Sequence, residues 1–106
     1  MTLYQILTDP DTGLDIPVAY SHFTKKSAPK EPPYLLYIGE GQETLKADNT
    51  FYHSRNTYQL EYYFTEKDET KEAAIEKLLL DNGFLYEKSE DVYIEDEGVF
   101  VIYYTI

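Results

Sequence analysis

Two histidines are the residues of this sequence best suited to acid–base chemistry, and each has a serine as its neighbour. His22 follows Ser21, and His53 precedes Ser54. A catalytic serine needs a histidine base, an orienting carboxylate and an oxyanion hole, and the sequence contains no Gly-x-Ser-x-Gly turn. Both pairs are expected within strands, where successive side chains point to opposite faces. The sequence therefore predicts structural histidines and no nucleophile–base pair.

Two glycine-containing segments resemble ligand-binding loops only in part. The segment DPDTGLD, residues 9–15, begins like an EF-hand loop, but Leu14 and Tyr20 stand where Gly and Glu are required. The segment Gly39-Glu40-Gly41 lacks the lysine that follows in a phosphate-binding loop. We therefore expect an ordinary turn at residues 9–15, and we predict neither a metal nor a cofactor.

A third group consists of acidic residues around the last expected strands. Paired carboxylates can hydrolyse glycosides, but a chain of 106 residues leaves little room for a sugar-binding cleft. We interpret these acids as a solvated rim, with a surface that mimics or repels nucleic acid as the alternative. No enzymatic activity is predicted. The acids are Glu87, Glu90, Asp91, Glu95, Asp96 and Glu97.

Charge and composition restrict the class of protein further. The chain has 20 acids and 9 bases, a formal charge of −11, which argues against nucleic-acid binding and against a polybasic membrane site. It has no cysteine, so neither a disulfide nor a thiolate metal site is expected. No apolar run approaches the roughly 20 residues of a membrane helix, and no secretory signal is expected. The sequence predicts one globular domain, residues 1–106, inside the cell.

The elements that would position these residues form an α+β fold with a mostly antiparallel or mixed sheet. A short helix is expected over residues 1–8. A long helix is expected from residues 65–68 to Asn82-Gly83, packed on one face of the sheet through Ala74, Ile75, Leu78 and Leu79. The order is α-β-β-β-α-β-β. Strands are expected at 18–23, 34–38, 50–64 and 99–106, with short strand-like segments at 84–88 and 92–95.

The strand expected at residues 50–64 is too long for a compact domain. Fifteen extended residues span roughly 50 Å, whereas a domain of this size is only about 30–35 Å across. The strand must therefore bend or project as part of a β-hairpin, with the polar segment Gly39–Asn49 as a loop at its tip that a partner protein orders. The residues predicted to contact other proteins are Gly39, Glu40, Gly41, Gln42, Glu43, Asp48, Asn49, Phe51 and Tyr52.

Taken in order, these segments resemble a known family. They are the helix MTLYQIL, the strands PVAYSHF and PPYLLYIGEG, the segment ADNTFYHSRNTYQLEYYFTEKD and the C-terminal DNGFLYEKSEDVYIEDEGVFVIYYTI. Over essentially its whole length the chain is similar to small tail-completion, or head–tail joining, proteins of tailed phages and prophages of Gram-positive bacteria. The resemblance implies a ring, often hexameric, between the capsid connector and the tail tube. It implies partners among copies of the chain and phage neck or tail proteins, no cofactor, and a location in the host cytoplasm during assembly and then in the virion.

Two alternatives stay open. Head-closure adaptors and tail terminators share the small α+β build, so the resemblance does not fix the position in the neck. A small acidic inhibitor or adaptor that binds one host protein, in the manner of a DNA mimic, would also account for the charge of −11. A ring component should oligomerise, whereas a DNA mimic should bind basic enzymes tightly as a monomer or dimer.

Overall fold

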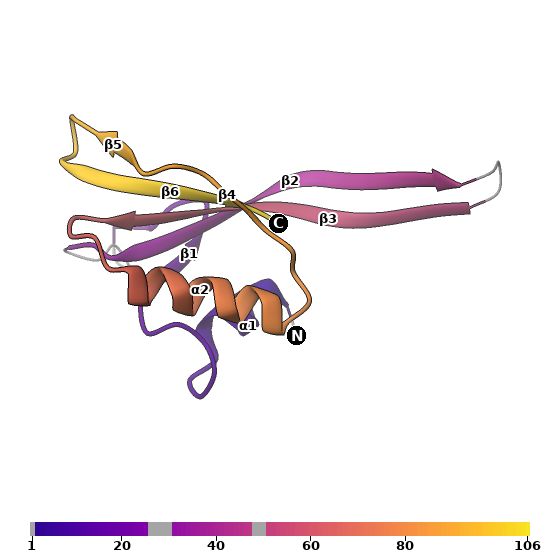
Figure 1. The fold of residues 1–106 in the computed structure, drawn as a ribbon, viewed down its shortest axis with the longest axis horizontal. Coiled ribbons are helices and arrows are strands. Elements are labelled where there is room, and N and C mark those ends of the chain that lie inside the picture. Colours follow the sequence, from indigo (N-terminus) through magenta and orange to yellow (C-terminus); the bar gives the residue numbers. More distant parts are fainter. Residues whose placement is uncertain (1, 26–30, 48–50) are drawn as a thin grey trace.

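A mostly antiparallel sheet of six strands, with both helices on one of its faces, forms the described part of the chain (Figure 1). The computed structural model describes residues 2–25, 31–47 and 51–106. The α+β class, the long helix on one face and the projecting hairpin are therefore confirmed. In chain order the elements are α1 (Leu3–Thr8), β1 (Val18–Tyr20), β2 (Tyr34–Ala47), β3 (Phe51–Phe64), α2 (Glu69–Asp81), β4 (Glu87–Lys88), β5 (Val92–Ile94) and β6 (Val99–Thr105).

The sheet has the strand order β1-β2-β3-β6-β4, and β5 also pairs with β6. β1 runs parallel to β2, and every other pair is antiparallel. The register places Leu35, Tyr62 and Ile102 side by side across β2, β3 and β6. The two segments that are apolar on both faces, residues 34–38 and 99–106, lie inside the sheet, as their sequences indicate.

The hydrophobic core lies between the sheet and the two helices. Ile75, Leu78 and Leu79 of α2 are buried, as expected, but Ala74 is exposed. Glu72 is buried in its place, because the helix turns the face that carries positions 72, 75 and 79 toward the sheet. The core residues are Leu3, Ile6, Leu7, Leu35, Leu60, Tyr62, Phe64, Ile75, Leu78, Leu79, Ile102, Tyr104 and Ile106.

Side-chain caps fix where both helices begin. The hydroxyl of Thr2 accepts a hydrogen bond from the backbone of Gln5, whose side chain accepts one from the backbone of Thr2. Asp68 caps α2 by accepting from the amides of Thr70 and Lys71. The long helix therefore starts at Glu69, slightly later than residues 65–68. Neither helix of the described chain is long and apolar enough to cross a membrane.

The first strand is shorter than its composition predicts. β1 ends at Tyr20, although the apolar pattern extends to Phe23. Ser21 has a φ of 64°, which takes the backbone out of the extended region. Ser21 and His22 therefore follow the strand and do not belong to it.

Candidate functional site

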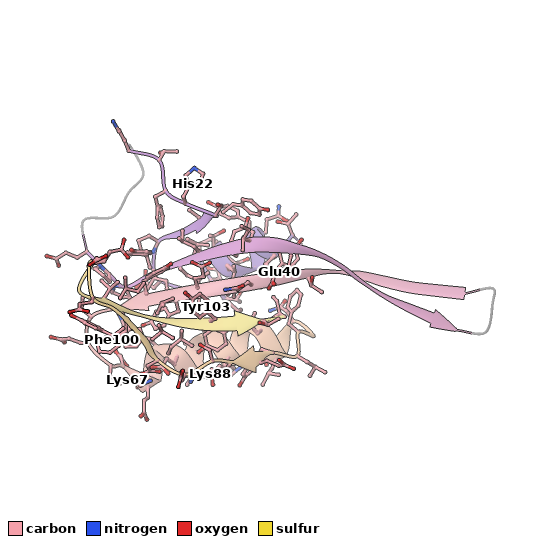
Figure 2. The ribbon with its side chains drawn as sticks, turned by 90° about the horizontal axis from the view of Figure 1, so that it is seen from above. His22, Glu40, Lys67, Lys88, Phe100 and Tyr103 are labelled. Carbon is pink, nitrogen blue, oxygen red and sulfur yellow. The ribbon has the colours of Figure 1, made fainter. Side chains whose placement is uncertain are left out.

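The hairpin of β2 and β3 extends beyond the rest of the sheet as a two-stranded ribbon (Figures 1 and 2). β1 pairs with β2 only over residues 35–37, and β6 pairs with β3 only over residues 59–64. Beyond them, β2 and β3 pair only with each other, from Gly41–Thr57 to Ala47–Phe51. We call residues 41–47 and 51–57 the arm. The molecule measures 51 × 32 × 28 Å, so the predicted projection is confirmed.

The prediction of a loop over Gly39–Asn49 is wrong for most of its length, because β2 continues to Ala47. Two strands paired away from the core bury neither face in the domain, so their sequence needs no alternation of apolar and polar residues. Of the predicted contact residues, Gly39, Glu40 and Gly41 lie at the root of the arm. Gln42 and Glu43 lie on β2, and Phe51 and Tyr52 on β3; Asp48 and Asn49 lie outside the described residues.

A β-bulge marks the point at which the arm leaves the sheet. Gly39 pairs with Tyr58 and Gly41 with Thr57, so Glu40 is the extra residue. Gly41 has a φ of 108°, which favours glycine. The hydroxyl of Thr57 donates to the carbonyl oxygen of Gly41 over 3.2 Å. The direction of the arm is thus set by a bulge that local hydrogen bonding supports.

The sheet face opposite the helices carries three rows of side chains and no helix of the described chain (Figure 2). Residues of β2, β3 and β6 that pair with one another share a face, and they alternate with the core residues along each strand. Apolar residues dominate the rows. Val101 is fully buried, most of the other side chains are half-buried, and Ile38 and Thr105 are exposed. We call these nine residues the open face: Tyr34, Tyr63 and Val101; Leu36, Glu61 and Tyr103; Ile38, Gln59 and Thr105.

Aromatic packing orders one end of the open face. The rings of Tyr34 and Tyr63 stack with centroids 5.0 Å apart, and Phe23 meets Tyr34 edge-on at 5.4 Å. The hydroxyl of Tyr63 donates to Oε1 of Glu61 over 2.6 Å. Burial and this hydrogen bond raise the pKa of Tyr63. Burial and the charge of Glu97 likewise raise the pKa of Tyr34, so this end of the face combines aromatic rings with negative charge.

A charged network that the sequence did not reveal lies on the helix side. The side chain of Glu72 is only 3% exposed, and Nζ of Lys67 and of Lys88 lie 2.8 and 2.9 Å from its carboxylate oxygens. Lys88 also contacts Glu76, which accepts a hydrogen bond of 2.8 Å from the hydroxyl of Tyr104. The sequence did contain one indication that Glu72 is buried, because it lies at helical spacing from Ile75 and Leu79. The network joins α2 to β4 and β6, and it is structural in character.

Of the residues considered for catalysis or metal binding, Ser21, His22 and the turn at residues 9–15 lie among the described side chains, whereas the side chains of His53 and Ser54 lie outside them. Nδ1 of His22 lies 3.3 Å from Oγ of Ser21, which corrects the expectation that strand geometry would separate them. The contact arises because both residues follow β1, and both belong to an exposed turn. Asp9 accepts from the amides of Asp11 and Thr12, as in an ordinary turn, and these bonds lower its pKa. No group of three potential metal ligands occurs among the described residues.

The acidic residues of the C-terminal segment form the solvated rim that the sequence predicts. All six are exposed. Asp91 also lies 3.0 Å from Nζ of Lys67, at the edge of the network around Glu72. Comparison of the chain with models of protein families, with curated proteins and with solved structures gave no match.

Proposed function

We propose that this chain is a structural subunit of a phage or prophage neck, a tail-completion or head–tail joining protein that assembles as a ring between the connector and the tail tube. The arm is the observation that carries the proposal. Its two strands pair only with each other, and the outer edge of each leaves backbone N–H and C=O groups free for a partner. Such a ribbon has little stability of its own in water, which favours a role in contact with another protein.

Charge and surface chemistry support the same proposal. A ring through which a DNA duplex passes must not hold it, and a charge of −11 on each subunit repels phosphate. The tyrosines of the open face provide contact area with an apolar body and a polar tip, which is typical of interfaces between proteins. The role requires neither catalysis nor a cofactor. Its partners are copies of the chain and neck or tail proteins, in the host cytoplasm during assembly and in the virion afterwards.

The proposal is tested by deleting the arm in a prophage that encodes this protein. Residues 41–57 are replaced by a two-residue turn, and the variant is supplied in trans to a deletion strain. We expect tails and DNA-filled heads to accumulate unjoined, while the full chain restores infectious particles. Ala74→Ser, at an exposed helix position, is the matched control and should complement fully.

The position in the neck follows from a second measurement. The purified chain is expected to be monomeric or weakly associating, and to enter purified tails or connector-bearing heads in several copies. Addition to tails alone would identify a tail-completion or terminator position, and addition to heads alone a head-closure position. Normal particles from the arm deletion, or tight binding of a monomer to one basic host protein, would contradict the proposal and favour the acidic inhibitor.

A further inference from the structure

We propose that the open face of one copy binds the arm of a second copy. The inference rests on the proposed function, because a ring subunit must contact copies of itself. It names the two surfaces that meet, and each is incomplete in the single chain. Among the described residues, the arm has no partner strand at either outer edge, and no helix packs on the open face, although Val101 at one end of that face is buried.

The composition of the open face indicates that another layer covers it. An antiparallel sheet with one face in water normally alternates apolar and polar residues along each strand. In β2, however, residues 34–38 are apolar on both faces, and Leu36 and Ile38 lie on the open side beside the half-buried Tyr103 of β6. Ile38 is 36% exposed, although its neighbour Tyr37 packs against the core. Contiguous apolar surface of this kind marks an interaction site.

Charge selects the arm as the occupant. Residues 41–57 contain two acids and two bases, whereas the other 18 acids and 7 bases lie elsewhere in the chain. The whole charge of −11 therefore belongs to the rest of the molecule, so a contact made through the neutral arm avoids most of the repulsion between two copies. Glu61 lies on the open face, and Glu97 is close enough to Tyr34 to raise the pKa of its hydroxyl. The arm sequence offers Lys46 and Arg55, together with Leu45, Phe51 and Tyr52.

Length and direction make the contact intermolecular. Seven residues of extended strand span roughly 23 Å, whereas β2, β3 and β6 lie only about 5 Å apart from strand to strand. One arm is therefore long enough to cross the open face. It does not reach the face of its own chain, because it continues β2 and β3 outward from the sheet (Figure 2). A contact between different surfaces of successive copies closes into a ring when the rotation between copies permits it.

Disulfide trapping tests the contact directly, since the chain has no cysteine. One preparation carries Ile38→Cys on the open face. The other carries Thr44→Cys or Leu45→Cys in the arm, two successive positions that sample both faces of a strand. The preparations differ in mass through an affinity tag, and they are mixed and oxidised at high protein concentration and again within purified particles. Because a disulfide requires Cα atoms within about 7 Å, it reports contact and not mere encounter.

We expect a mixed arm–face disulfide, at least about tenfold more abundant than either dimer of like chains. Leu85→Cys, at a residue 78% exposed beyond the end of α2, is the control and should give no mixed product. Ile38→Glu should weaken self-association about tenfold through charge repulsion, and Leu85→Glu should not. Arm–arm products alone, face–face products alone, or no product under either condition would overturn the inference.

The two proposals fail separately. A chain that enters particles in several copies but yields only arm–arm disulfides keeps the neck function and loses the arm–face contact. A chain that yields the arm–face disulfide but never enters heads or tails keeps the contact and loses the neck function. Ile38→Glu adds a measurement that does not depend on infection, because its effect is read by sedimentation of the purified protein.

Discussion

Nζ of Lys88 lies 2.9 Å from Oε1 of Glu72 and thereby ties the two-residue strand β4 to the first turn of α2. The Glu72 side chain is 3% exposed and that of Lys88 34%, so the pair is only partly screened by water. Burial alone would lower the pKa of Lys88, but hydrogen bonds to Glu76 and Glu72 raise it to about 12. β4 pairs with β6 at two residues, and this ion pair adds a contact between β4 and the helix.

Replacement of Glu72 by Gln should destabilise the fold by about 1–3 kcal/mol, because the partly buried ammonium groups of Lys67 and Lys88 lose their shared carboxylate. The measurement is the free energy of unfolding from urea denaturation. Asp81→Asn, which breaks the exposed pair with Lys77, should change it by no more than about 0.5 kcal/mol. Equal effects of the two substitutions would show that burial of Glu72 does not strengthen the network.

Two buried tyrosines should respond in opposite ways to loss of the hydroxyl. The Tyr104 hydroxyl donates to Glu76 over 2.8 Å, so Tyr104→Phe should destabilise the protein by about 1.5–3 kcal/mol. The hydroxyl of Tyr62 is buried and has no hydrogen-bond partner among the described residues, and burial with the nearby Glu72 charge raises its pKa to about 12. Tyr62→Phe should be neutral or stabilising by up to about 1 kcal/mol. Thermal and urea midpoints of both variants check this order, and a loss in Tyr62→Phe as large as that in Tyr104→Phe would contradict it.

Stability should fall in acid, in part through Glu76. Burial raises the pKa of this carboxyl, but hydrogen bonds from Lys88 and Tyr104 outweigh burial and leave it below its ordinary value of 4.5. The folded state therefore binds this proton less readily than the unfolded chain does. The contribution is complete above the unfolded pKa and is lost as the pH falls through the folded one. Thermal midpoints between about pH 6 and pH 2 should drop less steeply for Glu76→Gln than for the parent chain. Glu87→Gln, at an exposed acid, serves as the control, and parallel curves for Glu76→Gln and the parent would refute the assignment.

Gly13 should not tolerate a side chain. A Cβ atom there would lie 2.5 Å from the amide nitrogen of Asp9 and 2.8 Å from the carbonyl oxygen of Leu7, and neither backbone atom can move freely. Gly13→Ala should therefore cost about 1–3 kcal/mol. At Gly39 the nearest atom to a Cβ is the Tyr20 hydroxyl at 3.4 Å, so Gly39→Ala should leave the urea midpoint nearly unchanged. A tolerated Gly13→Ala would show that the turn at residues 9–13 can open.

Removal of the arm should leave the thermal midpoint within a few degrees of the parent chain. The core residues that β2 and β3 supply, among them Leu35, Leu60 and Tyr62, all lie within the body of the sheet. Replacement of residues 41–57 by a two-residue turn is measured by circular dichroism. A large loss of stability would show that the arm supports the fold itself and is not an appendage for a partner.

The sequence was sufficient for elements whose burial repeats with a clear period. Leu60, Tyr62 and Phe64 alternate along β3 because only one face meets the helices, and Asp68 and Asn82 mark the ends of α2 with side-chain and backbone caps. The projection of the hairpin followed from length alone. The residues 34–38 and 99–106 also revealed interior strands, since polar side chains are nearly absent from them.

The remaining features depend on tertiary contacts that no local pattern encodes. Burial of Glu72 requires two lysines, Lys67 and Lys88, brought together from either side of α2. The strand nature of residues 39–47 comes from pairing with β3, so their glycines and polar residues suggested a loop. The end of β1 depends on one left-handed residue, Ser21, for which serine gives no strong signal. The open face was foreseeable only as strands apolar on both sides, because the sequence does not indicate that both helices pack on the same side of the sheet.

The bulge at Glu40 separates two stretches of the same pair of strands. The backbone amides of the two stretches should exchange hydrogen with water at very different rates. On one side, the amides of Leu35 and Leu60 are enclosed by neighbouring strands and the core, so their hydrogen exchange should require global unfolding. On the other side, each arm strand has one neighbour, and opening one ribbon exposes its amides without disturbing the core. A single hairpin should thus span almost the full range of exchange rates. Binding of a partner to the arm would be visible as slowed exchange on the outer side of Glu40.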